Sequence, residues 1–121
     1  MKKKGMTDKA LREFFENLNE RFFQNRIPMR LNIRFASDRE LKNSDGHHRD
    51  GPGMLTVGEI LIHNDLRYHP DLACLVLIHE MCHAELHESG YIGYEHDGGH
   101  GSLWHARMVE LFKAGIFEGL L

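Results

Sequence analysis

The stretch from Pro70 to about Glu88, PDLACLVLIHEMCHAELHE, constrains the fold of this chain more than any other segment. Apolar residues occur on nearly every side of a helix drawn over it, which is typical of a helix buried in a core. Pro70 suits the first helical position, and Asp71 complements the helix dipole. The sequence therefore predicts a buried helix here. A chain of 121 residues suits one compact domain, residues 1–121, built around that helix.

Two histidines of this helix, His79 and His83, have the spacing of metal ligands. Residues i and i+4 lie one turn apart on the same helix face, so both imidazoles can reach one Zn²⁺ at about 2.0–2.1 Å. Glu80 is adjacent, near enough to act on water at the metal but turned away from direct ligation. This is the HExxH arrangement of zinc peptidases, in which the glutamate is the general base. The alternative is a polar cluster whose members satisfy one another inside the core.

A catalytic zinc site needs a third protein ligand and one open position. His87 continues the spacing of the first two histidines, but it lies about 12 Å from His79 along the helix. Two nitrogens bound to one zinc lie within about 4 Å of each other, which excludes His87. The remaining candidates are His96, His100 and Glu110. We favour His100, because the glycine on each side of it lets the backbone turn sharply toward the helix.

Two further helices are predicted, one toward each end of the chain. The segment from Thr7 to about Pro28 has apolar residues at helical spacing, with Thr7 as the N-cap and Asp8 favourable in the first turn. The stripe predicted to face the core consists of Leu11, Phe14, Phe15, Leu18 and Phe22. The second helix is predicted at about Ser102 to Ala114 and carries Leu103, Trp104, Met108, Leu111 and Phe112.

A small sheet is predicted between the first helix and the buried helix. Residues 29–35 alternate between apolar and polar side chains, which is typical of a half-buried strand. Residues 37–53 are rich in turn residues and are predicted to be a loop. In residues 54–63, a two-residue hairpin turn at Gly58-Glu59 would place the apolar side chains of both strands on one face. The predicted fold class is therefore α+β: an N-terminal helix, a small, mostly antiparallel, three-stranded sheet, the buried HExxH helix and a C-terminal helix.

Charge and cysteine content restrict the environment of the protein. The formal net charge is −3, which does not indicate a basic nucleic-acid binder, and the basic start MKKKG is typical of a solvated tail. Cys74 and Cys82, if both are on the buried helix, have Cα atoms about 12 Å apart, whereas a disulfide needs less than about 7 Å. We therefore expect reduced, buried thiols. The sequence has no run of eighteen apolar residues and no apolar signal-peptide core, so we expect no membrane association and a cytoplasmic location.

The order of these motifs resembles a known family. HEMCHA, followed by a glycine-containing loop and GGHGSLWHARM, is similar to the SprT-like metallopeptidases. Their pattern is an HExxH helix, a loop, and HGxxF at the start of the next helix. FFENLNERFF followed by a strand, and then GMLTVGEILIHNDL, match their layout, so the resemblance covers nearly the whole chain. It implies a zincin-like fold and a zinc-dependent endopeptidase. In that reading His79, His83 and His100 are the zinc ligands and Glu80 is the catalytic base.

Two departures from the family pattern concern the last helix and the chain's length. Trp104 occupies the position after HG where phenylalanine is usual, and we expect it to pack as phenylalanine would. Many members carry a C-terminal four-cysteine zinc ribbon or DNA-binding tails, so this sequence looks like a minimal catalytic domain.

The resemblance implies a protein or peptide substrate, which we expect to lie extended along a sheet edge. Eukaryotic relatives called Spartan degrade proteins crosslinked to DNA, so DNA-associated proteins are candidate substrates. The net charge does not support direct DNA contact. Tyr91, Tyr94 and His96 are candidates for contacts to the substrate or the transition state. We expect a monomer.

Two alternatives remain open from the sequence. The first is a non-catalytic, zinc-stabilised binding module, in which His96 or His105 would be a fourth ligand, because a structural zinc site is normally closed by four protein ligands. The second is a latent peptidase, in which the glycine-containing segment 84–101 covers the site until a partner opens it.

Overall fold

A computed structural model of the chain describes residues 5–41, 46–49, 58–88 and 102–120. Within them the elements are α1 (Asp8–Phe22), β1 (Asn32–Ala36), α2 (Asp38–Leu41), β2 (Gly46–Arg49), β3 (Glu59–His63), the 3-10 helix η1 (Asn64–Tyr68), α3 (Pro70–Glu88) and α4 (Ser102–Ala114). The α+β class is confirmed, as are the three predicted helices, which are α1, α3 and α4. Among the described residues, no helix has the length and apolarity needed to span a membrane.

The start of α1 is fixed by the cap that the sequence predicts. The Thr7 hydroxyl oxygen accepts a hydrogen bond from the Ala10 N–H at 3.0 Å. Asp8 also accepts the Phe35 N–H through Oδ1 at 3.0 Å, which connects the start of this helix to β1. The core-facing stripe is narrower than predicted. Phe15 is fully buried, but Phe14 is 42% exposed because it lies at the margin of that face.

The end of α1 is fixed by a buried amide rather than by Pro28. Asn19 is fully buried; its Nδ2 donates to the Ile27 carbonyl at 2.8 Å and its Oδ1 accepts the Ile27 N–H at 3.2 Å. Between them the chain reverses through Gln24 and Asn25, whose φ angles are 49° and 56°. The side chain of Asn19 thus satisfies both backbone groups of Ile27 at the point where the chain leaves the helix.

Replacing this amide tests its contribution to stability. Asn19→Ala is expected to lower the free energy of unfolding by about 1–3 kcal/mol, because two buried backbone groups lose their partners. The measurement is urea denaturation followed by circular dichroism. Asn17→Ala, in the exposed part of the same helix, is the control and should change stability by less than about 0.5 kcal/mol. Equal midpoints for the two variants would contradict this role.

The sheet has three strands in the order β1-β3-β2, and its pairing differs from the prediction. β1 pairs with β3 in parallel, with Asn32 opposite Glu59, and only β2 and β3 are antiparallel. The prediction of a mostly antiparallel sheet is therefore wrong. A parallel pair requires a long crossover between its strands, and the connection from Ala36 to Glu59 provides one.

The predicted hairpin turn at Gly58-Glu59 is also wrong. Glu59 is a strand residue that pairs with both Asn32 and Arg49. The Gly58 carbonyl accepts the Asn32 N–H at 2.9 Å, so this glycine belongs to the ladder. The antiparallel partner of β3 is supplied by residues 46–49, within the segment predicted to be a loop. The strand predicted at 54–57 lies outside the described residues.

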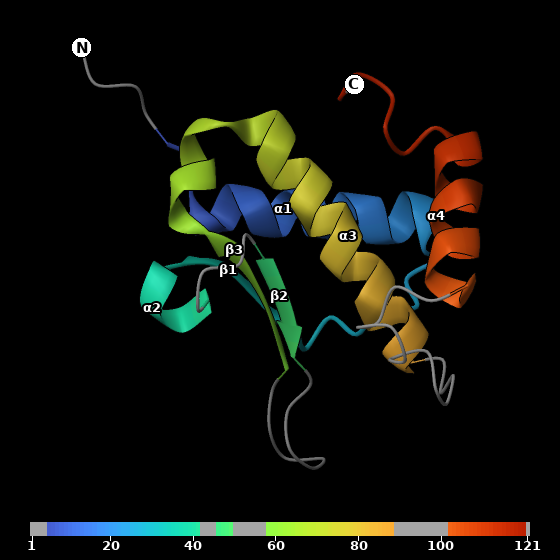
Figure 1. The fold of residues 1–121 in the computed structure, drawn as a ribbon, viewed down its shortest axis with the longest axis horizontal. Coiled ribbons are helices and arrows are strands. Elements are labelled where there is room, and N and C mark those ends of the chain that lie inside the picture. Colours follow the sequence, from blue (N-terminus) through green and yellow to red (C-terminus); the bar gives the residue numbers. More distant parts are fainter. Residues whose placement is uncertain (1–4, 42–45, 50–57, 89–101, 121) are drawn as a thin grey trace.

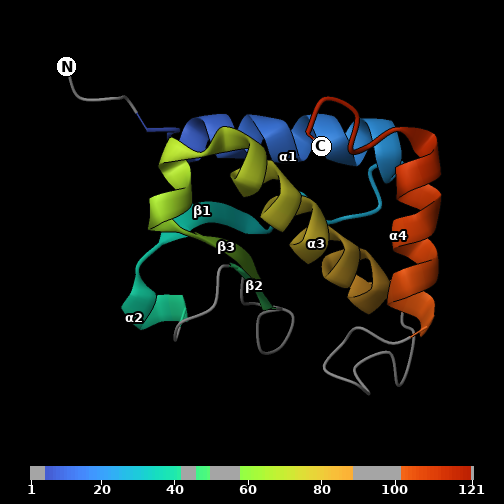
Figure 2. The same ribbon diagram turned by 45° about the horizontal axis from the view of Figure 1, so that its top comes forward.

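The main core lies between the sheet and the two long helices. α1 contacts β1, whereas α3 contacts β2 and β3. In both views α3 crosses α1. α4 lies beside the C-terminal ends of α1 and α3, on the side of the molecule opposite α2 (Figures 1 and 2). The main hydrophobic cluster includes Leu11, Phe15, Ile33, Phe35, Ile60, Ile62, Leu77, Ile78, Met81 and Leu111. Leu61 packs instead with Ala36 and Leu41, which places α2 on the other face of the sheet.

Candidate metal centre

α3 is both a core helix and the carrier of the candidate ligands. Leu77, Ile78 and Met81 are fully buried in the main cluster. His79 and His83 are only half-buried, so they lie on a different side of the helix from the core contacts. The prediction of burial on nearly every side is correct for the middle of α3. It is wrong for the first turn, where Leu72 is 50% exposed.

The two imidazoles converge. The Nε2 atoms of His79 and His83 are 3.2 Å apart, and their ring centroids are separated by 4.9 Å at an interplanar angle of 68°. This is the result of the one-turn spacing, since side chains at i and i+4 project over the same patch of helix surface. The two ring nitrogens therefore face one point on this side of α3.

Glu80 lies beside the pair and is shielded from solvent. It is 6% exposed, and its Oε1 is 3.8 Å from the His79 Nε2. A carboxylate at that distance can exchange a proton with a water molecule held next to the imidazoles. The predicted neighbourhood of His79, Glu80 and His83 is thus present in the structure.

Trp104, near the start of α4, contacts both candidate ligands. Its ring lies edge-on to His79 with centroids 5.0 Å apart, and it stacks on His83 with centroids 5.8 Å apart and an interplanar angle of 26°. Sequence reasoning identified it only as a packing residue of the last helix. The sole signal of its position was its place three residues after HG, because a contact between two helices does not show in the spacing within either of them.

The donor set and its geometry fit a zinc ion. Two nitrogens bound to one tetrahedral zinc at about 2.0–2.1 Å are about 3.3–3.4 Å apart, and the observed separation of the two Nε2 atoms is 3.2 Å. Imidazole nitrogen is a common zinc ligand, and Glu80 supplies the adjacent base. The described residues therefore include two imidazoles placed where two of the three ligands of a catalytic zinc site would lie.

Among the residues that the structure describes, no group of three histidine, cysteine, aspartate or glutamate side chains is placed to hold a metal ion. Neither Glu110, a candidate third ligand, nor His105, the candidate fourth ligand of a closed site, joins the histidine pair there. Glu110 is 68% exposed at its side chain and binds Arg107 at 3.1 Å. His105 is exposed and lies edge-on to Trp104, with centroids 5.2 Å apart.

The other predicted site residues, Tyr91, Tyr94, His96 and His100, lie outside the described residues, so their roles stay predictions. The segment that contains them joins α3 to α4, and His100 precedes the first residue of α4 by two positions. Any contact that fixes the start of α4 therefore also limits where residue 100 can reach.

The two cysteines of the chain lie on α3. Cys74 and Cys82 are free and buried, as predicted. Burial raises the pKa of Cys74 to about 11 and that of Cys82 to about 12, with Glu85 adding to the second shift. Both side chains therefore belong to the packing of α3 and form no disulfide.

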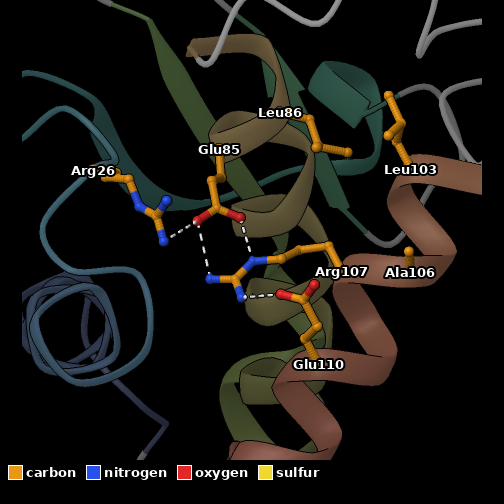
Figure 3. Close-up of a pocket in the computed structure, with 7 residues that line it drawn as sticks. All are labelled: Arg26, Glu85, Leu86, Leu103, Ala106, Arg107 and Glu110. Atoms are coloured by element: carbon orange, nitrogen blue, oxygen red, sulfur yellow. Dashed lines mark hydrogen bonds and ion pairs between the residues drawn. The ribbon is translucent and has the colours of Figure 1, made fainter.

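A cavity of about 200 Å³ lies between α3 and α4, apart from the two histidines. Its wall includes Glu85 and Arg107, together with the apolar side chains of Leu86, Leu103 and Ala106 (Figure 3). Neither His79 nor His83 lines it, so this cavity is not the candidate metal centre.

Comparison with known proteins assigns the chain to a family. Residues 11–118 match the SprT-like family. The chain belongs to the SprT-like family. The match extends from α1 to beyond the end of α4, so both helices that meet at the candidate centre fall within the family region. SprT-like membership makes this a metalloprotease-like domain. No curated protein matches the chain.

Proposed function

We propose that this chain is a zinc-dependent endopeptidase with a zincin-like catalytic domain. The observation that carries the proposal is the convergence of the His79 and His83 Nε2 atoms to 3.2 Å, beside the buried Glu80 carboxylate. Membership of the SprT-like family supports the same activity. His79 and His83 would hold the ion, with His100 as the third ligand and His96 as the runner-up.

The chemistry divides between the ion and the protein. Zinc, when bound, supplies Lewis acidity that polarises a carbonyl and lowers the pKa of water. Glu80 accepts the proton of the attacking water at a carboxylate oxygen and delivers it to the nitrogen of the leaving amine as the C–N bond breaks. Shielding of Glu80 from solvent suits this role, because it keeps competing water from the carboxylate. Tyr91, Tyr94 or His96 would contact the oxyanion or the substrate.

The family relation also supports a proposal for the substrate class. We propose peptide and protein substrates, with DNA-associated proteins among them. The net charge of −3 does not favour direct binding of DNA by this chain. In this proposal the DNA holds the protein substrate, and the chain binds that protein.

Metal analysis and a cleavage assay test the proposal together. The purified chain is expected to bind about one zinc per molecule and to cleave casein and histone, with a chelator abolishing cleavage and added zinc restoring it. Each assay is run with and without single- and double-stranded DNA. Histone cleavage that rises with DNA would support the DNA-associated substrates. Stoichiometric zinc held by four protein ligands, with no cleavage under any condition, would reject the peptidase in favour of a binding module.

A further inference from the structure

A buried carboxylate joins α3 to α4 close to the candidate metal centre. Glu85 is 4% exposed and follows His83 by two positions, so it projects from a different side of α3. The Nε of Arg107 donates to its Oε1 at 2.5 Å and one terminal nitrogen donates to its Oε2 at 3.0 Å (Figure 3). Arg107, on α4, therefore binds the Glu85 carboxylate through two hydrogen bonds.

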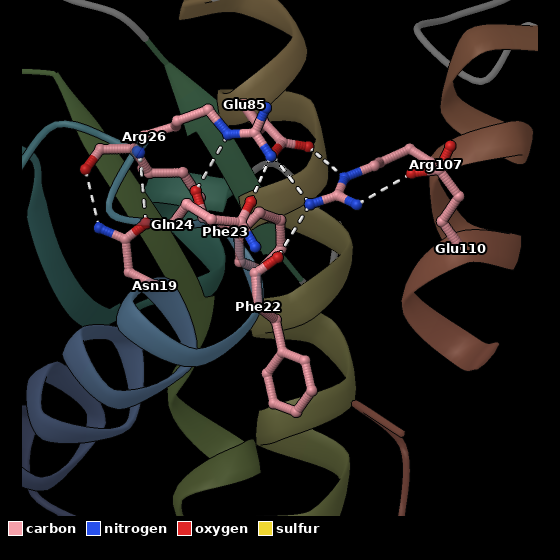
Figure 4. A network of polar contacts seen from close by, with 9 residues as sticks. Asn19, Phe22, Phe23, Gln24, Arg26, Glu85, Arg107 and Glu110 are labelled. Carbon is pink, nitrogen blue, oxygen red and sulfur yellow. Dashed lines mark hydrogen bonds and ion pairs between the residues drawn. The ribbon is translucent and has the colours of Figure 1, made fainter. Parts of the chain in front are cut away.

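The same guanidinium also contacts the end of α1. Its terminal nitrogen donates to the Phe22 carbonyl at 2.9 Å, and the group lies over the Phe23 ring, 5.3 Å from the centroid (Figure 4). Arg26, from the turn that follows, approaches the Glu85 carboxylate at 3.7 Å. Three segments far apart in the sequence thus meet at one ion pair.

The chemistry of this pair favours a single arrangement of the helices. A planar guanidinium presents its N–H groups in a fixed fork, so a two-point bond to a carboxylate defines orientation as well as distance. The Arg107 side chain is only 16% exposed, so water does not readily replace either partner. Sliding or rotating α4 on α3 would break at least one of these bonds and leave a buried charge unsatisfied.

The position of α4 in turn determines the position of Trp104. Trp104 precedes Arg107 by three positions, which makes the two side chains neighbours on the helix surface. Its ring packs on Cys82 and Leu86 of α3 as well as on the two imidazoles. A shift of α4 that separated Arg107 from Glu85 would therefore also move the Trp104 ring relative to His79 and His83.

We propose that Glu85 and Arg107 form a positioning pair for the metal centre. By holding α4 on α3, the pair keeps Trp104 against the imidazoles of His79 and His83 and thereby keeps their Nε2 atoms converged. It also fixes the start of α4, two residues beyond His100. This inference rests on the proposed function for the identity of the ion. The proposed effect of the pair is on the geometry of the centre, so Glu85 and Arg107 are positioning residues.

Conservative variants test the pair with two measurements. Arg107→Lys keeps a positive charge beside Glu85 but removes the fork, and Glu85→Gln keeps the shape of the acceptor but removes its charge. Arg34→Lys is the matched control, because Arg34 makes a similar two-point contact with Glu40, at 3.4 and 2.6 Å, on a different part of the fold. The first measurement is the zinc dissociation constant, by competition with a chromophoric chelator. The second is the emission of Trp104, the only tryptophan of the chain, with and without zinc.

Both test variants are expected to bind zinc about 10–100-fold more weakly than the wild type, the usual effect of losing a partner that orients a ligand. Their Trp104 emission should shift to longer wavelength, because the indole loses ring contacts and gains solvent. Arg34→Lys should match the wild type in both measurements. All are made at a temperature at which circular dichroism shows folded protein, because a purely stabilising role would lower the melting temperature and leave both values unchanged. Unchanged zinc affinity and unchanged emission in both test variants would overturn the proposal. If Arg107→Lys does not fold, the same two measurements on Glu85→Gln alone test the proposal.

Failure of this inference is distinguishable from failure of the proposed function. Neither measurement uses peptide hydrolysis, so a wild-type chain that binds zinc but cleaves nothing would contradict the peptidase and leave the positioning pair standing. If the wild type bound no zinc, the metal-free emission of Trp104 would decide: a shift in the two test variants supports the pair, and identical emission rejects it.

Discussion

Glu80→Gln is expected to reduce peptide hydrolysis by about 10²–10⁴-fold while zinc stays bound, because the amide cannot accept the proton of water. Glutamine has nearly the shape of glutamate, so the largely buried site around residue 80 should not need to repack. The two imidazoles are unchanged, and zinc content should therefore equal that of the wild type. The measurement is the initial rate of casein cleavage together with the zinc content of the same sample.

An exposed glutamate gives the control for this substitution. Glu13→Gln changes the same functional group on the solvent side of α1 and should leave both values unaltered. Loss of activity together with loss of zinc would assign Glu80 to the binding of the metal. Full activity in Glu80→Gln would remove the residue from the proton transfer altogether.

His100→Ala is expected to weaken zinc binding more than the loss of an orienting partner does, because it removes a direct ligand. Loss of an orienting partner costs about 10–100-fold in affinity. Peptide hydrolysis should be lost with the metal. His96→Ala is the matched comparison, since it removes an imidazole from the same connecting segment, and it should keep zinc affinity. The measurement is again chelator competition, followed by activity at saturating zinc.

The reverse result would exchange the two assignments: zinc lost in His96→Ala and kept in His100→Ala would make His96 the third ligand. Zinc kept in both variants would mean that the described histidine pair binds zinc without help from either residue. It would also reject the three-histidine site as a whole.

Local patterns in the sequence were sufficient for the helices and for the histidine pair. The cap at Thr7 and the end of α4 at Ala114 follow from chemistry within one or two turns, and the structure has both. The i, i+4 spacing of His79 and His83 predicts that both imidazoles lie on one face of the helix, within reach of one ion. Membership of the SprT-like family was likewise evident from short motifs.

The sheet was harder to predict because its pairing is determined by distant segments. The segment of β2, Gly46–Arg49, has no apolar alternation and contains turn-forming glycine, so nothing local indicates a strand. It pairs because β3 presents an edge to it. The parallel pairing of β1 with β3 likewise depends on the path of the connecting chain. The hairpin interpretation assumed that neighbours in sequence must pair, whereas β3 pairs with β1 and β2.

The contacts between helices at the candidate centre were also beyond local reasoning. From the sequence alone, Arg107 is indistinguishable from a surface arginine of an amphipathic helix. Glu85 is likewise only one of several polar residues of α3. Their burial arises only when α3, α4 and the end of α1 come together. Trp104 is informative for the same reason: the helix that carries it was predicted, but its contact with the histidines of another helix was not.

The anchoring of α3 has a consequence for metal exchange at the proposed zinc site. Leu77, Ile78 and Met81 hold the helix in the main core from a side that the histidines do not share. Small zinc domains that lack such a core unfold when their metal is removed. Here the ligand-bearing backbone is supported by apolar packing, so removing the ion would leave the scaffold assembled. Cobalt(II) could then be introduced by simple dialysis, which would make the otherwise colourless centre visible to absorption spectroscopy.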